Sequence, residues 1–397
     1  MSRAAIAATT AGDGADALPA DAARELEALL RAPVFGCDPQ ARQAKLLSVL
    51  KTELSWAIAR HAPLRRYVEA WPIDYRDARR LADLPYLPAA AFKADPPLAL
   101  VPPRCIVRTL ASSATTGQSP SRVVLDAGTA RRTMKGITSI LRDFIGPARR
   151  PCLVIDTAES LDRGAELGAR AAAIQGLRTF ATDSVCCLES DARGAPLLNA
   201  AKLAAFAAAV GDGEAIACGL TSVVWQHLVL PMSEQGLALR MPNLRLLHSG
   251  GWKRLQHLAV SRQAFAAGVA SVFGCPVTHV VDFYGMIEHV GVVYPDCIYG
   301  NKHVPAFADV IVRDPLTLEP LQPGRRGIVE VCNALATSFP GYALLTDDIA
   351  EVVCTDGCPC GRRGSAFRFV MRVPQAEMRG CGNVGASRGR EAAGASG

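Results

Sequence analysis

The sequence predicts an α/β protein, in which strands of mixed β-sheets alternate with helices along most of the chain. Two observations lead to this prediction. Short apolar runs typical of strands, such as CLVID at 152–156, alternate with helical patterns such as NAAKLAAFAAAV at 199–210. Several of these runs also end in turns, which is where α/β folds carry their functional loops. The later strands are expected in LRLLHSGG, VTHVVDFYG, DVIVRD, GIVEVC and IAEVV.

A helical segment is expected to precede this core. Leu46, Leu50 and Leu54 recur every four residues, so they would line one face of a helix. Both ends of the chain are rich in small residues and poor in large apolar ones, a composition typical of disorder. The predicted organisation is a disordered leader at 1–20, one unit at 21–371 (helical over 21–92, α/β core over 105–371) and a short mobile tail at 372–397.

Composition and charge exclude two classes of function. The net charge of +6 comes from 43 basic and 37 acidic residues, and no basic stripe carries interleaved aromatic residues, so nucleic-acid binding is not expected. Apolar stretches fall short of the roughly 20 residues of a membrane span. The first residues lack the apolar centre of a secretion signal, which predicts a cytoplasmic protein. In that compartment, the thirteen cysteines are expected to be free thiols, metal ligands or catalytic groups, not disulfides.

The stretch SSATTGQSPSRVVLD at 112–126 concentrates hydroxyl and glycine residues directly before a strand-like run. Two interpretations are open. Such residues form ordinary surface loops. They also form phosphate-binding loops, in which hydroxyl and backbone N–H groups converge on an anion.

Three later stretches favour the phosphate loop: DFYGMIEH at 282–289, YALLTDDIAEV at 342–352 and FRFVMRV at 367–373. In this order the four stretches resemble the motifs of the adenylate-forming (ANL) superfamily. Within it, the sequence most resembles the acyl-protein synthetase (LuxE) family, which is related to phenylacetate-CoA ligases. This closer resemblance covers roughly 87–382 and includes LPAAAFK, HSGGWKRL and VPQAEMRGCG. It implies a large N-terminal adenylating domain with mixed sheets.

The resemblance also implies a reaction and a set of residues. A carboxylic acid, which the family implies is a fatty acid, would react with ATP in the presence of Mg²⁺ to give an acyl-adenylate and pyrophosphate. Charge that develops on the α-phosphate calls for amides, hydroxyls and a cation. By resemblance, Tyr284, beside Gly285, would stack near the adenine, Glu288 would hold Mg²⁺, Asp348 would accept hydrogen bonds from the ribose hydroxyls, and Arg372 would reach the ribose or phosphate. The residues that would hold the phosphates are Ser112, Ser113, Thr115, Thr116 and Gly117.

Two positions depart from the family pattern. Ala114 stands where the phosphate loop usually has glycine, which restricts the backbone there. Ile287 replaces a threonine whose hydroxyl would contact the α-phosphate. Both departures put catalysis in doubt and favour, as an alternative, a non-catalytic nucleotide-binding protein.

Only 25 residues follow Arg372, so the chain is expected to lack most of the small C-terminal domain and its lysine. Lys253, in SGGWKRL, is the candidate substitute; the alternative is a surface lysine. Cys381, in RGCG, has a cationic neighbour and flanking glycines, which favour a reactive, mobile thiolate. In the resembling synthetases such a cysteine accepts the acyl group and passes it to a partner, here an acyl reductase or an acyl carrier protein. The alternative is an incidental thiol.

Four residues form a candidate zinc site. CPCGRRG contributes Cys358 and Cys360, and YPDCIYGNKH contributes Cys297 and His303. Three thiolates and one imidazole suit a tetrahedral structural Zn²⁺. Cys354 is a competing ligand, and the alternative is a set of reduced, unliganded thiols.

Together, these assignments predict an acyl-protein synthetase that activates an acid and then acylates its own Cys381. The nearest alternative is an acyl- or aryl-CoA ligase or a carrier-protein loading enzyme, in which an external thiol accepts the acyl group. The sequence does not distinguish aliphatic from aromatic acids.

Overall fold

The computed structural model describes residues 18–112, 119–160, 166–168, 174 and 176–373. Three helices come first: α1 (Ala20–Arg31), α2 (Pro39–Arg60) and α3 (Ala62–Glu69). Asp38 caps α2 by accepting the amide of Ala41 at 2.9 Å. The leucines predicted to share one face of α2 are all buried in the main core.

The predicted helical segment ends earlier than 92. After Glu69 the chain continues through short 3-10 turns, η1 (Tyr75–Asp77), η2 (Leu81–Asp83) and η3 (Ala89–Lys93), and the two-residue strand β1 (Leu87–Pro88). Prolines 72, 85 and 88 explain the difference, because each lacks the amide that a continuous helix needs and restricts the residue before it.

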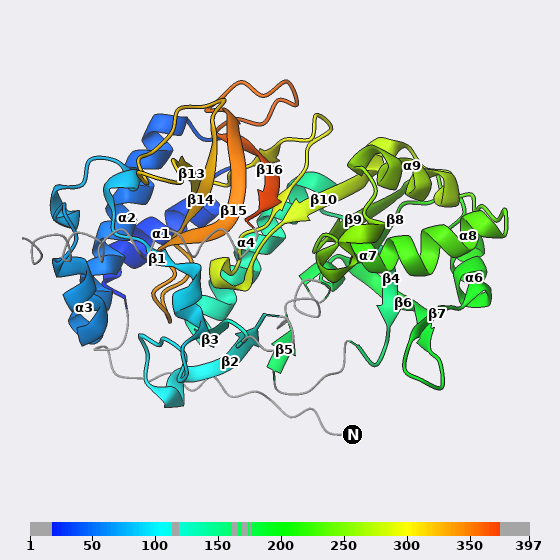
Figure 1. Cartoon of the computed structure of the whole chain (residues 1–397), viewed down its shortest axis with the longest axis horizontal. Coiled ribbons are helices and arrows are strands. Elements are labelled where there is room, and N and C mark those ends of the chain that lie inside the picture. Colours follow the sequence, from blue (N-terminus) through cyan, green and yellow to red (C-terminus); the bar gives the residue numbers. More distant parts are fainter. Residues whose placement is uncertain (1–17, 113–118, 161–165, 169–173, 175, 374–397) are drawn as a thin grey trace, which may run out of the picture.

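A six-stranded sheet packs against these helices (Figure 1). Its order is β12-β16-β15-β14-β13, with β1 added parallel to β15. The bounds are β12 (Lys302–His303), β13 (Ala308–Arg313), β14 (Arg326–Asn333), β15 (Ala343–Cys354) and β16 (Ala366–Arg372). The other pairs are antiparallel, and the β15–β16 register sets Asp348 opposite Arg372.

A seven-stranded sheet forms the other half of the molecule, in the order β11-β10-β9-β8-β4-β6-β7. Its five central strands are parallel, so their carboxyl ends lie at one edge. The bounds are β4 (Arg150–Thr157), β6 (Ala181–Ser190), β7 (Pro196–Leu198), β8 (Ala215–Leu220), β9 (Leu244–Ser249), β10 (Val280–Tyr284) and β11 (Tyr294–Pro295).

Separate apolar clusters cover the two faces of this sheet. The helices are α4 (Ala127–Ile145), α6 (Ala200–Val210), α7 (Thr221–Val224), α8 (Leu230–Glu234) and α9 (Arg262–Phe273). Shorter helical turns are η4 (Pro103–Cys105), η5 (Trp225–Val229), η6 (Lys253–Leu258), η7 (Val277–His279) and η8 (Ile287–His289). The helix predicted at 199–210 is confirmed as α6, with Asn199 as its N-cap.

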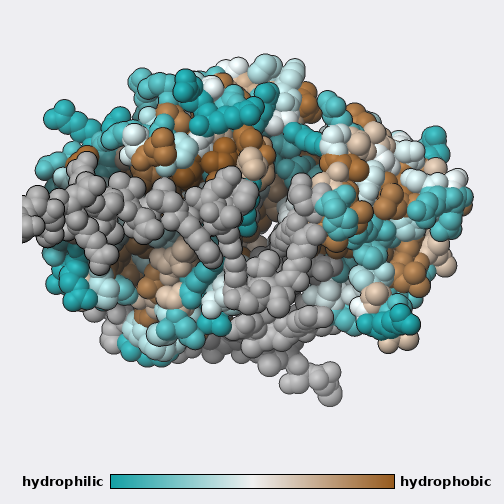
Figure 2. Space-filling view, in the orientation of Figure 1, coloured by the Kyte–Doolittle hydropathy of each residue, from teal (hydrophilic) through white to brown (hydrophobic). Residues whose placement is uncertain are grey.

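A third, three-stranded sheet has the order β3-β2-β5, with β2 (Ile106–Ala111), β3 (Arg122–Asp126) and β5 (Glu166–Gly168). The strands expected from the sequence are therefore present, and the α/β prediction is confirmed. In Figure 1, β10 points from one half of the molecule toward β16 in the other. On the face shown in Figure 2, hydrophilic residues lie mainly along the outer rim of both halves. Within the described residues, no helix is both long and apolar enough to cross a bilayer.

Candidate active site and metal-ligand cluster

Asp348, on β15, is the point at which three of the predicted nucleotide-binding residues meet. Its carboxylate is 1% exposed. The hydroxyl of Tyr284 donates to its Oδ2 at 2.8 Å, and Nε of Arg372 donates to its Oδ1 at 2.9 Å. The Arg372 side chain is 69% exposed, so it lies at the mouth of the site. β10 and β16 thus supply one residue each to a carboxylate held inside the molecule.

The protonation of Tyr284 follows from this environment. Burial raises the pKa of its hydroxyl well above the ordinary value, and the negative charge of Asp348 raises it further. Tyr284 therefore stays protonated and remains a hydrogen-bond donor. The hydrogen bond with Asp348 in turn raises the pKa of Arg372, which stays charged.

Aromatic rings surround Tyr284. Its ring stacks on Phe369 at 5.6 Å and on Tyr294 at 6.0 Å between centroids, and Phe367 meets it edge-on. Phe369 is 39% exposed. An exposed aromatic face beside the Asp348 carboxylate is a surface on which a planar base can stack. Phe369 was not predicted from the sequence. The alternation FRF at 367–369 is the signal that indicates it, since alternation places both phenylalanines on one face of β16.

Glu288 lies in η8, close to the beginning of β3. It is buried, and burial raises the pKa of its carboxyl, while a hydrogen bond with Ser121 opposes that change. A bound cation would favour the ionised carboxylate, as a ligand for Mg²⁺ requires. The position therefore fits the role predicted from the sequence.

Ser112 and Ser121 join the two ends of the hydroxyl-rich loop. The amide of Ser112 donates to the carbonyl of Ser121, and the amide of Ser121 donates to Oγ of Ser112, both at 2.9 Å. The Ser112 side chain thus closes the base of the loop. The other predicted residues of the loop lie outside the described residues: Ser113, Thr115, Thr116 and Gly117, and with them Ala114.

Gly285 and Ile287 of the 282–289 motif have ordinary surroundings. A Cβ at Gly285 would meet Val293 at 3.4 Å, so the structure sets no steric requirement for glycine there. Ile287 is buried in η8.

Lys253 begins η6, after Gly250 and Gly251 at φ of 90° and 56°. The structure does not describe the side chain of Lys253 or any atom of Cys381.

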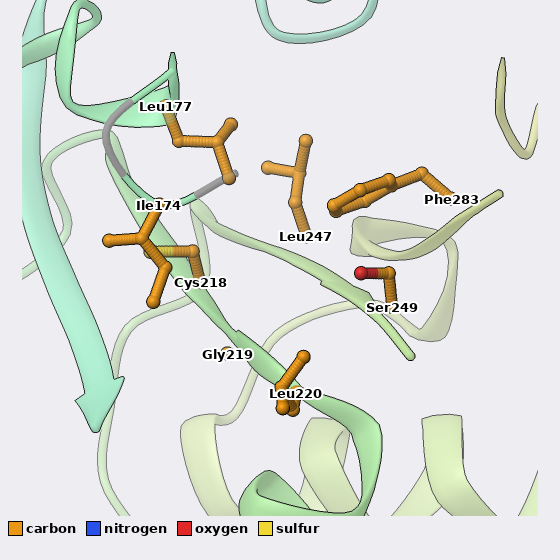
Figure 3. A pocket seen from close by; sticks show the side chains of 8 residues that line it. All are labelled: Ile174, Leu177, Cys218, Gly219, Leu220, Leu247, Ser249 and Phe283. Carbon is orange, nitrogen blue, oxygen red and sulfur yellow. The ribbon is translucent and has the colours of Figure 1, made fainter. Parts of the chain in front are cut away.

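A small apolar cavity lies beside this site, at the carboxyl ends of β8, β9 and β10 (Figure 3). Its volume of about 10 Å³ is that of roughly one water molecule. Gly219 borders it, and a Cβ there would lie 2.8 Å from Val224, so only glycine fits. The lining residues are Ile174, Leu177, Cys218, Gly219, Leu220, Leu247, Ser249 and Phe283. Sequence reasoning missed this cavity, because its members come from four separate segments.

The four predicted metal ligands lie together. One ligand atom from each of Cys297, His303, Cys358 and Cys360 lies within 4.8 Å of every other. Nε2 of His303 is 3.2 Å from Sγ of Cys360. Tetrahedral Zn²⁺ bonded to sulfur at about 2.3 Å sets its ligand atoms roughly 3.5–3.8 Å apart, so shifts of about 1 Å or less would bring the four ligand atoms to that spacing. Cys354 is not a member of this group of described residues.

The protonation of the cluster suits a metal in part. Burial lowers the pKa of His303 to about 4, so its imidazole is neutral, as a ligand must be. Burial alone would raise the pKa of the Cys358 thiol, but hydrogen bonds, led by that from Asn301, lower it overall. Nδ2 of Asn301 lies 3.4 Å from Sγ of Cys358, and Arg368 fixes Asn301 by donating to its Oδ1 at 2.8 Å. Burial raises the pKa of Cys297 to about 11, so this thiol would lose its proton only on metal binding.

Comparison with known proteins shows which family the sequence resembles. The family model described as "Acyl-protein synthetase, LuxE" matches residues 45–388. Two relatives are named long-chain-fatty-acid–luciferin-component ligase. The one from Vibrio harveyi is 30% identical over 152 residues, 38% of this chain and 39% of the relative. The one from Aliivibrio fischeri is 26% identical over 142 residues, 35% and 36% of the two chains. The matched region thus spans about two fifths of each relative.

Solved structures show the same fold. A structure of 2-hydroxyisobutyryl-CoA ligase in the postadenylation state has a TM-score of 0.64 at 16% identity, and covers 86% of this chain and 70% of that one. An open conformation of the same ligase has a TM-score of 0.61 at 16% identity, with 83% and 74% covered. The architecture is therefore that of an adenylate-forming domain. With the family model matching most of its length, the chain belongs to the acyl-protein synthetase (LuxE) family.

Proposed function

We propose that this protein is an enzyme that activates a fatty acid with ATP and then transfers the acyl group to a cysteine thiol. The observation that carries the proposal is the convergence of Tyr284 and Arg372 on the buried carboxylate of Asp348. The family supports the reaction, and the printed names of the two relatives support a long-chain fatty acid as the substrate class.

In the first half-reaction, a carboxylate oxygen of the acid attacks the α-phosphorus of ATP. An oxygen–phosphorus bond forms, the bond to the bridging oxygen of the β-phosphate breaks, and pyrophosphate leaves with the electron pair. Asp348 would accept hydrogen bonds from the ribose hydroxyls, and Phe369 and Tyr284 would provide the aromatic surface for adenine. Arg372 is exposed enough to turn from Asp348 toward the ribose or phosphate.

Mg²⁺ bound at Glu288 would neutralise charge on the phosphates. Glu288 forms a hydrogen bond with Ser121, which closes the base of the hydroxyl-rich loop together with Ser112. An ion bound by the Glu288 carboxylate would therefore lie beside the base of this loop. Lys253 would supply a further cation toward the reacting phosphate.

In the second half-reaction, the thiolate of Cys381 would attack the acyl carbonyl. A carbon–sulfur bond forms, the mixed-anhydride bond breaks, and AMP leaves with the electron pair. The resulting thioester would be handed to a cytoplasmic partner, either an acyl reductase or an acyl carrier protein.

We propose Zn²⁺ as the ion for Cys297, His303, Cys358 and Cys360. The donor set of three thiols and a neutral imidazole supports a closed structural site. Elemental analysis tests it with two variants: Cys358→Ser should lose the zinc, while Cys354→Ser should keep one equivalent per chain. Wild-type protein that contains no zinc when purified in the absence of chelators would refute the proposal that these four residues bind Zn²⁺.

The test of acid activation is ATP–pyrophosphate exchange with a panel of fatty acids of different chain length and aromatic acids. Exchange that depends on a fatty acid supports the proposal, and the best acid identifies the substrate. ATP binding without acid-dependent exchange across the panel would instead indicate a nucleotide-binding protein without catalysis.

A further inference from the structure

A row of alternating charges, whose central members Lys302 and Asp296 are buried, lies beside the metal-ligand cluster and ends at Asp282, the first residue of the 282–289 motif. Nζ of Lys302 lies 2.9 Å from Oδ2 of Asp282 and 3.1 Å from Oδ1 of Asp296. Nη2 of Arg262, from α9, lies 2.8 Å from the other oxygen of Asp296. The Lys302 side chain is only 3% exposed. Lysine is almost never buried unless it is paired, so this ammonium group holds its two carboxylates at a defined place.

The two carboxylates belong to different parts of the site. Asp296 directly precedes the ligand Cys297, and Lys302 directly precedes the ligand His303. Asp296 and Lys302 also form a β-bridge, which fixes this hairpin internally. Asp282 lies on β10, which pairs with β11 just before Asp296, and the amide of Asp296 donates to the carbonyl of Asp282 at 2.8 Å. Lys302, on β12 of the six-stranded sheet, therefore adds a charged side-chain contact between the hairpin that carries two metal ligands and β10, the strand that carries Tyr284 of the proposed nucleotide site.

Asp282 stands where a shift of β10 would matter most. The next residue, Phe283, lines the apolar cavity, and the one after it, Tyr284, donates to Asp348. The Asp282 side chain is 34% exposed. On its other flank it faces His248, whose Nδ1 is 3.8 Å from Oδ1 of Asp282.

His248 offers Asp282 little support as a cation. Burial lowers its pKa to about 4, so the ring is neutral at ordinary pH. Its Nδ1 is 2.9 Å from Oγ1 of Thr221, which shares that nitrogen. Lys302 is thus the charged group in direct contact with Asp282 among the contacts of the described chain. Its ammonium also donates to the Asp282 carboxylate at 2.9 Å.

We propose that Lys302 is a positioning residue for acid activation: by holding Asp282, it sets the end of β10, and with it Phe283 and Tyr284, against Asp348 and the apolar cavity. This inference rests on the proposed function in that its effect is read on the binding of ATP and acid. Lys302 touches neither substrate in this account; it acts through β10.

The test compares Lys302→Met, which keeps the length of the side chain but removes its charge, with Lys302→Arg, which keeps the charge. Lys202→Met is the matched control, because Lys202 pairs with Glu189 on the surface. Lys302→Met should raise the KM for ATP by about tenfold with a smaller change in kcat. Lys302→Arg, which keeps the charge, should have a KM for ATP much closer to that of wild type. Lys202→Met should behave as wild type.

A lower unfolding temperature with unchanged KM values in Lys302→Met would show a merely structural ion pair and overturn the inference. Should Lys302→Met not fold, Asp282→Asn removes the negative charge from the same ion pair at its more exposed member. It must then raise the KM for ATP in the same way, and an unchanged KM would again refute the idea. If wild-type protein shows no acid-dependent exchange, the proposed function fails, and direct ATP affinity of the same variants decides the role of Lys302.

Discussion

Asp348→Asn is the substitution that most directly perturbs the proposed nucleotide site. It keeps the size of the side chain, but it removes the negative charge and replaces one acceptor oxygen with an NH₂ donor. Asp348 accepts from Tyr284 and from two nitrogens of Arg372, so at least one of these hydrogen bonds is lost. The ribose would lose an ionised acceptor at the same place.

The size of the effect follows from these contacts. A hydrogen bond to a charged group contributes about 1.5–3 kcal/mol. Its loss in the ATP complex corresponds to a decrease in kcat/KM for ATP of roughly 10- to 150-fold. The effect on stability should be smaller, at most about 1 kcal/mol, because the Arg372 side chain is largely exposed and its ion pair is screened by water.

ATP–pyrophosphate exchange at saturating fatty acid, with ATP varied, measures this decrease. Asp347→Asn is the matched control, since it makes the same chemical change one residue earlier, on the opposite side of β15. It should leave kcat/KM within about twofold of wild type. An Asp348→Asn variant that retained wild-type kcat/KM for ATP would refute the assignment of Asp348 to the ribose.

Three further predictions concern other parts of the site. Burial raises the pKa of Glu288 above its ordinary value, so its stabilising contribution is present at low pH and is lost as the pH rises through the raised pKa. Glu288→Gln should therefore melt at a higher temperature than wild type at pH 7 but not near pH 4, while losing Mg²⁺-dependent exchange; equal melting at both pH values would contradict this. Gly219→Ala places a Cβ 2.8 Å from Val224 and should lower stability by about 1–3 kcal/mol, whereas Gly176→Ala, whose Cβ would meet Ile137 at 3.6 Å, should not; denaturant unfolding compares them. Phe369→Ala removes an exposed ring stacked on Tyr284 and should raise the KM for ATP about two- to tenfold, and an unchanged KM would exclude adenine stacking there.

The α/β class and the strands of the core could be predicted from the sequence because apolar periodicity and turn residues act locally. The grouping of Cys297, His303, Cys358 and Cys360 also followed from residue type and spacing, and the structure brings the four together. Their metal and the roles of the site residues stay predictions.

Other features depend on contacts that no local pattern encodes. Lysine normally lies on the surface, so nothing in GNKH indicates that Lys302 is buried between the carboxylates of Asp282 and Asp296. The role of Ser112 as a phosphate ligand, implied by the resemblance, stays a prediction, and no local pattern indicates that its hydroxyl accepts the amide of Ser121 across the loop. The helical prediction over 21–92 is wrong beyond Glu69, because the apolar residues there still have helical spacing while three prolines interrupt the backbone hydrogen bonds.

The central claim is that the acid, once activated, is transferred to Cys381. Intact-protein mass after incubation with ATP, Mg²⁺ and a fatty acid tests it most directly, on wild type and on Cys381→Ser. The account predicts an acyl adduct on wild type that hydroxylamine removes and that Cys381→Ser does not form. Acid-dependent pyrophosphate exchange in both proteins with no adduct on either would contradict it, and would indicate a ligase that uses an external thiol.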